Sequence, residues 1–141
     1  RQTTSKDLIL LVASSLLSTG GGTATALDDK YVLTEKEITQ VLTATTAFNT
    51  VIKNAATSKG LAFVDANTKM VELSQKSGIQ FNGVKYTATF VTGGTFSLDG
   101  VHLTGRGYAL IANEFLKQIN TTYGSTLPMV NINKYSGVTF P

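Results

Sequence analysis

Apolar residues along this chain recur with helical spacing in two long segments. Between Ile38 and Ala55 they fall every three or four residues, the period of one helix face. Thr34 and Glu37 form a capping box before this segment, and Gly60 follows it, so we expect a long helix between these signals. A second helix is expected after Thr104, a residue type that caps helices. Its apolar positions are Tyr108, Ile111, Ala112, Phe115, Leu116 and Ile119.

Two short apolar runs without alternation predict strands. Leu8 to Val12 precedes the first long helix, and Leu61 to Val64 follows it. Such runs are typical of strands buried on both faces of a parallel sheet. A strand, a crossover helix and a second strand make the unit of that sheet. We therefore expect an α/β fold with three layers, in which helices flank a mainly parallel sheet and those two runs are neighbouring or near-neighbouring parallel strands.

Turn-forming residues mark smaller elements after the second run. Asn82-Gly83 separates two β-prone triplets, which is a strong signal for a β-hairpin. Asp65 directly follows the second predicted strand, where open α/β sheets keep their ligands. The same residue also has the position of an N-cap for a short helix that stops at Gly78, and this is the favoured interpretation.

Composition indicates one compact domain over residues 1–141. The chain is 42% hydrophobic and 15% charged, which is enough apolar content for a core. Its net charge of +3 comes from scattered residues, so we expect no nucleic-acid groove. It has no cysteine and one histidine, so we expect no disulfide, no metal site and no cofactor. Gly20 to Gly22 lacks the Lys-Ser/Thr ending of a P-loop and is read as an exposed loop.

The sequence also bears on membrane insertion, processing and cellular compartment. The most apolar run, Leu8 to Leu17, is shorter than the ~20 residues of a membrane helix, so no transmembrane segment is expected. The chain starts at Arg1 rather than at a methionine, and we interpret it as a processed or excised piece. The absence of thiols is compatible with an oxidising compartment, which favours a periplasmic, cell-surface or secreted protein.

Candidate chemistry centres on Asp99 and His102. A loop can fold an Asp-x-x-His segment so that the carboxylate accepts a hydrogen bond from Nδ1–H of the imidazole. The opposite nitrogen, Nε2, is then free to act as a general base for a hydroxyl nucleophile. The alternative is a loop histidine that bonds Asp99 and has no catalytic role.

The segment Asp-Gly-Val-His-Leu-Thr at 99–104, followed by Gly107, Tyr108 and an amphipathic helix, resembles the last sequence block of the SGNH, or GDSL-type, hydrolases. The resemblance is strongest from Phe96 to Ile119. It implies a flavodoxin-like fold, and it implies that Asp99 and His102 belong to a Ser-His-Asp triad that hydrolyses acyl esters.

The nucleophile block of that family is missing. No serine here follows a Gly-Asp pair, and Ser14 and Ser15, directly after the first predicted strand, come nearest to the expected place. The resemblance therefore implies that the serine is supplied by missing sequence, in an N-terminal half of the same protein. That half, or a homo-oligomer partner, would also cover the exposed edge of a half sheet. Alone, the chain is expected to be inactive.

Two other functions stay open. One is a non-catalytic α/β domain that binds carbohydrate or protein, with Tyr31, Tyr86 and Tyr123 as exposed stacking platforms. The other is a hydrolase of a different kind, in which Asp65 and Asp99 flank a glycosidic bond.

Overall fold

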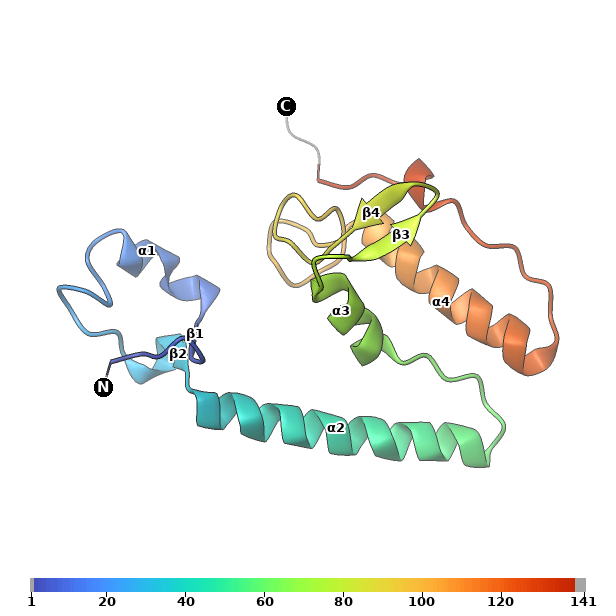
Figure 1. Cartoon of the computed structure of the whole chain (residues 1–141), viewed down its shortest axis with the longest axis horizontal. Helices are drawn as coiled ribbons and strands as arrows, with labels where there is room; N and C mark the ends of the chain where they lie inside the picture. Colours follow the sequence, from blue (N-terminus) through green and yellow to red (C-terminus); the bar gives the residue numbers. More distant parts are fainter. Residues whose placement is uncertain (1, 139–141) are drawn as a thin grey trace. The chain divides into compact units, whose positions relative to one another are not determined.

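A computed structural model describes residues 2–138. The chain divides into two compact units, residues 1–52 and 53–141, and the boundary falls inside the longest helix (Figure 1). The expectation of one domain stays a prediction. The helices are α1 Ser14–Leu17, α2 Glu35–Ser58, α3 Ala66–Ser74 and α4 Gly105–Tyr123, with 3₁₀ helices at Leu11–Ala13, Asp29–Tyr31 and Ile132–Lys134. The strands are β1 Leu8–Ile9, β2 Val32–Leu33, β3 Ile79–Phe81 and β4 Val84–Tyr86.

In the first unit, a two-residue ladder leads directly into α2. β1 pairs with β2 in antiparallel register, with Leu8 opposite Leu33. The predicted capping box is present, because the Thr34 amide donates to Glu37 Oε2 at 2.8 Å and the Glu37 amide lies 3.4 Å from Thr34 Oγ1. At the same helix end, the Glu35 amide donates a hydrogen bond to Asp7 Oδ1 at 2.9 Å. These bonds satisfy amides that a helix start leaves without intrahelical partners.

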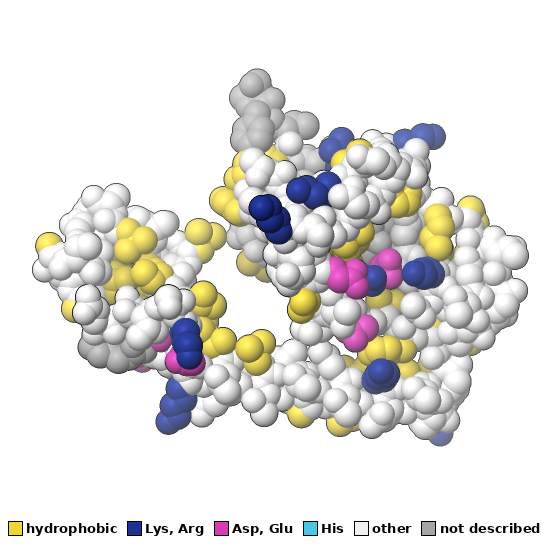
Figure 2. All heavy atoms as spheres, in the orientation of Figure 1, with side chains coloured by type: hydrophobic (Ala, Val, Ile, Leu, Met, Phe, Trp, Pro, Cys, Tyr) yellow, Lys and Arg dark blue, Asp and Glu magenta, His cyan; other side chains and the backbone are white. Residues whose placement is uncertain are grey.

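The apolar stripe of α2 lies mostly at the surface. Figure 2 shows hydrophobic side chains along this helix, and its buried residue is Ala56. Large side chains that are more than half exposed are Val41, Leu42, Phe48, Val51 and Ile52. The capping box and the apolar period thus predict this helix correctly, but its apolar face is not buried.

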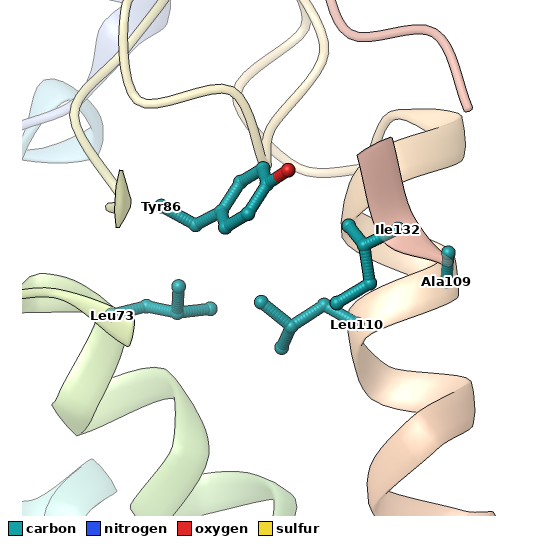
Figure 3. Close-up of a cluster of buried hydrophobic side chains, with 5 residues drawn as sticks. All are labelled: Leu73, Tyr86, Ala109, Leu110 and Ile132. Carbon is teal, nitrogen blue, oxygen red and sulfur yellow. The ribbon is translucent and has the colours of Figure 1, made fainter. Parts of the chain in front are cut away.

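The second unit contains the hydrophobic core. Five buried side chains from α3, β4, α4 and the last 3₁₀ helix meet there, as Figure 3 shows, and they are Leu73, Tyr86, Ala109, Leu110 and Ile132. The β3–β4 hairpin contributes Tyr86, and its turn has Asn82 and Gly83 at positive φ, 45° and 77°. That conformation matches the primed turns that suit two-residue hairpins.

Two asparagines attach the C-terminal segment to α4. Asn113 Nδ2 donates to the Val130 carbonyl at 2.9 Å, and Asn113 Oδ1 accepts from the Val130 amide at 2.8 Å. Seven residues further along the helix, Asn120 makes the same pair of bonds with Leu127, both at 2.8 Å. The segment after α4 therefore runs along this helix, and Ile132 reaches the core.

The prediction of a three-layer, mainly parallel sheet, and with it a flavodoxin-like fold, is wrong. Within residues 2–138 the strands form two antiparallel sheets of two strands each. The Leu8 to Val12 run is a strand only at Leu8–Ile9, after which the chain turns into a 3₁₀ helix. Leu61 to Val64 is not a strand, and its Ala62 amide bonds the Tyr123 hydroxyl at 3.1 Å instead of a neighbouring backbone. Apolar runs favour strands, but a sheet requires a second run placed to pair with each.

Several local predictions are confirmed: α2 and α4, the hairpin at Asn82-Gly83, and the short helix α3 with Asp65 as its N-cap. The interpretation of Tyr86 as an exposed platform is wrong, since this side chain is 1% exposed and lies in the core. Among residues 2–138, no helix combines the length and apolar content needed to cross a membrane.

Candidate active site

Asp99 and His102 lie on a narrow loop that a β-bridge closes. Phe96 and Leu103 form an isolated antiparallel bridge at its base. Inside the bridge, the Ser97 amide donates to the His102 carbonyl at 2.8 Å. The Gly100 amide then donates to the Ser97 carbonyl at 3.0 Å, and Gly100 has a φ of +70° that favours glycine at this turn. The loop backbone therefore bonds to itself.

The loop brings the two predicted site residues together. His102 Nδ1 lies 2.6 Å from Asp99 Oδ2, so the hydrogen bond that the spacing predicts is present. The neutral ring that donates from Nδ1 leaves Nε2 without a proton, and the ring geometry directs Nε2 away from the carboxylate. The His102 side chain is 72% exposed and that of Asp99 50% exposed, which leaves the imidazole open to an incoming group.

The other oxygen of Asp99 has three donors. Ser97 Oγ donates to Oδ1 at 2.6 Å, and the amides of Val101 and His102 each donate at 2.9 Å. The Ser97 hydroxyl above all, then the Val101 amide and the His102 ring, hold the pKa of Asp99 well below its usual range. These hydrogen bonds stabilise the charged form, so Asp99 is a carboxylate at neutral pH.

Ser97 is the member of this cluster that the sequence reasoning missed. The available signal was a hydroxyl two residues before a carboxylate, a spacing at which short polar side chains bond locally.

Helix α4 fixes the end of the loop. Thr104 is its N-cap: Oγ1 accepts from the Gly107 amide at 3.1 Å and donates to the Gly94 carbonyl at 2.8 Å. Gly107 is buried against the preceding segment, and a Cβ there would collide with the Thr95 carbonyl oxygen and lie 3.0 Å from Leu103 Cβ. The glycine five residues after His102 thus allows α4 to start close to the β-bridge.

An open groove lies beside the carboxylate. Its lining residues are Ser97, Leu98, Asp99, Thr104, Gly105, Ser136, Gly137 and Val138. The far wall belongs to the C-terminal segment, which Arg106 holds: its amide donates to the Ser136 carbonyl at 3.1 Å, and its Nε donates to the Tyr135 carbonyl at 2.6 Å. The spacing also predicted that His102 Nε2 faces a groove at the carboxyl ends of parallel strands, but His102 is not among the residues that line this groove and the described residues form no parallel sheet.

The other candidate residues have structural partners. Asp65 Oδ1 accepts from the Thr68 amide at 2.9 Å, and this bond, as the main cause, lowers the pKa of Asp65. Ser14 and Ser15 belong to α1 in the first unit. Across the described residues, His, Asp and Glu side chains form no cluster that could hold a metal ion.

Comparison with models of protein families, with curated proteins and with solved structures found no match to this chain.

Proposed function

We propose that this chain supplies the histidine base and the aspartate of a serine ester hydrolase, as its resemblance to the last block of the SGNH hydrolases implies. The observation that carries the proposal is the 2.6 Å contact between His102 Nδ1 and Asp99 Oδ2 on an exposed loop. A carboxylate that holds one ring nitrogen orients the ring and stabilises the imidazolium that forms during proton transfer.

The proposed reaction is hydrolysis of an acyl ester. A serine hydroxyl attacks the ester carbonyl while His102 Nε2 takes its proton, and the C–O bond to the alcohol breaks as His102 returns that proton to the leaving oxygen. Water then attacks the acyl-serine with the same base, which releases the acid and restores the serine. Asp99 stays charged throughout, which agrees with its lowered pKa.

The serine is proposed to come from outside these residues, from an N-terminal half of the same protein. Ser97 lies nearest to the pair in sequence, but its hydroxyl donates to Asp99 rather than to the imidazole. A polypeptide that delivers a serine needs a surface to bind near the pair, and the exposed apolar residues Leu98 and Val101 of the same loop support that requirement.

The test is an ester-hydrolysis assay with short-chain aryl esters on the complete product of the gene and on the 141-residue chain. We expect His102→Ala to abolish turnover of the complete product and Asp99→Asn to lower it strongly, since the wrong imidazole tautomer is then held. Gln80→Ala, an exposed residue of β3, is the control. Thermal melts of all variants should coincide within a few degrees.

A fluorophosphonate probe identifies the nucleophile in the same samples. It should label one serine outside the 141 residues, and labelling should disappear in His102→Ala. If His102→Ala keeps the parental rate while folded, the hydrolase proposal is wrong.

If the hydrolase proposal fails, the same exposed apolar residues support the second candidate, a non-catalytic protein-binding domain. The carbohydrate-binding version is weakened, because Tyr86 is buried and the Tyr123 hydroxyl bonds the Ala62 amide.

A further inference from the structure

We propose that Ser97 is a positioning residue for the Asp99–His102 pair: its hydroxyl holds the Asp99 carboxylate in the orientation that presents Oδ2 to His102 Nδ1. The effect on turnover rests on the proposed function. The effect on the geometry of the pair does not, and it can be measured without any activity.

Positioning is a requirement here because the pair lacks support from packing. The two side chains are 72% and 50% exposed, so neighbouring apolar groups do not lock their rotamers. The terminal torsion of an aspartate is broad, so the plane of the carboxylate can rotate at little cost. Hydrogen bonds to one oxygen then fix this plane and keep the other oxygen on the imidazole.

Ser97 supplies the side-chain member of those hydrogen bonds. The amides of Val101 and His102 approach Asp99 Oδ1 at 2.9 Å, and the Ser97 hydroxyl approaches it at 2.6 Å. A hydroxyl bonded to a carboxylate is charge-assisted and stronger than a neutral pair. Oδ1 therefore has three donors and Oδ2 is left for the ring.

The backbone of Ser97 connects it to the base as well. Its amide donates to the carbonyl of His102 at 2.8 Å, and its carbonyl accepts from Gly100 at 3.0 Å. One residue thus fixes the backbone that carries the histidine and the side chain that orients it. A substitution that keeps the backbone and removes the hydroxyl separates these two contributions.

A nucleophilic role for Ser97 is inconsistent with the same contacts. A nucleophile in this chemistry donates its proton to Nε2 of the base. The Ser97 proton is instead directed at Oδ1 of Asp99, the oxygen that does not contact the ring.

The experiment compares Ser97→Ala, Ser97→Thr and Ser97→Cys in the 141-residue chain, with Ser77→Ala as the control serine in the same unit. Nitrogen NMR shifts of His102 report its tautomer, and the carboxyl carbon of Asp99 reports its titration. We expect Ser97→Ala to mix the two His102 tautomers and to move the pKa of Asp99 upward, towards its usual value. Threonine should restore both readouts, cysteine should give an intermediate result, and Ser77→Ala should change neither.

Unchanged tautomer and titration in a folded Ser97→Ala overturn the proposal. If alanine unfolds the loop, the comparison of threonine with cysteine decides, because both keep a side chain of similar size and differ in donor strength. Equal readouts for these two would also overturn it.

In the complete product, Ser97→Ala should lower kcat by up to about 100-fold with KM unchanged, as expected for a misplaced catalytic group. If the unsubstituted complete product is inactive but Ser97→Ala gives the expected NMR changes, the hydrolase proposal is wrong and the positioning role stands. If the unsubstituted product is active and Ser97→Ala leaves its kcat unchanged, the positioning role is wrong and the hydrolase proposal stands.

Discussion

Helices α2 and α4 have comparable apolar patterns and different surroundings. α4 buries Gly107, Ala109, Leu110 and Asn113 against the hairpin, α3 and the C-terminal segment. α2 is longer, at 24 residues against 19, yet Ala56 is its buried residue. A helical period therefore indicates that a helix has an apolar face, but it does not specify which element packs against that face. The candidate site lies at the start of α4, which buries Ala109 and Leu110, although Tyr108 and Phe115 of its predicted apolar stripe are more than half exposed.

The largest expected effect separates these two faces directly. Leu110→Ala removes a side chain that is 3% exposed and should lower the free energy of unfolding by about 2–5 kcal/mol. Leu42→Ala, at 59% exposure on α2, should change it by less than about 0.5 kcal/mol. Urea unfolding followed by circular dichroism measures both. Equal losses would mean that the face of α2 is covered in solution.

The next effect concerns the close approach at the start of α4. Gly107→Ala places a methyl group against the Thr95 carbonyl and should cost about 1–3 kcal/mol through overpacking. Gly137→Ala is the matched control, because its added Cβ meets Arg106 Cδ at an ordinary 3.5 Å. Thermal melts of the two variants test this, and a Gly107→Ala protein as stable as the control would contradict the tight packing beside the loop.

A similar loss is expected where α4 holds the C-terminal segment. Asn113→Ala leaves the Val130 amide and carbonyl without their partner and should cost about 1–3 kcal/mol. Asn120→Ala removes the equivalent pair at Leu127 in a more exposed place and should cost less. Limited proteolysis after Leu127, alongside melts, reports release of the segment. Equal cleavage in both variants would show that burial does not distinguish the two asparagines.

The smallest expected effect is the response to acid. Asp65 and Asp99, both in the second unit, have lowered pKa values in the folded state, through bonds from Thr68 and from Ser97 respectively. As pH falls, these two carboxylates therefore become protonated in the unfolded chain before they do so in the folded chain. Their stabilisation is fully present above the usual aspartate pKa of about 3.9 and is lost as pH falls below it. Hydrogen exchange across this range should show α3 and α4 losing protection, and Asp65→Asn should reduce the loss in α3. Unchanged protection of both helices would contradict the prediction.

Local structure was predictable from short stretches of sequence. Thr34 and Glu37 cap α2, Asp65 caps α3, Thr104 caps α4, and Asn82-Gly83 turns the hairpin, each as expected. The contact between Asp99 and His102 belongs to the same class. All of these depend on bonds between residues a few positions apart, so the neighbouring residue types are sufficient to specify them.

The tertiary structure decided what pairs with what. The apolar runs at Leu8 and Leu61 predicted a parallel sheet, but strand pairing joins segments distant in the chain, and an apolar run does not name its partner. The pattern did not decide burial either, since Leu110 lies outside the predicted stripe of α4 and is 3% exposed, whereas Leu42 lies in the stripe of α2 and is 59% exposed. The groove beside Asp99 forms because Ser136 and Gly137 lie next to the start of α4, and no local sequence pattern predicted this contact. The sequence by itself thus determined α2, α3, α4, the hairpin turn and the contact between Asp99 and His102, whereas contacts over long separations decided the sheets, the core and the groove.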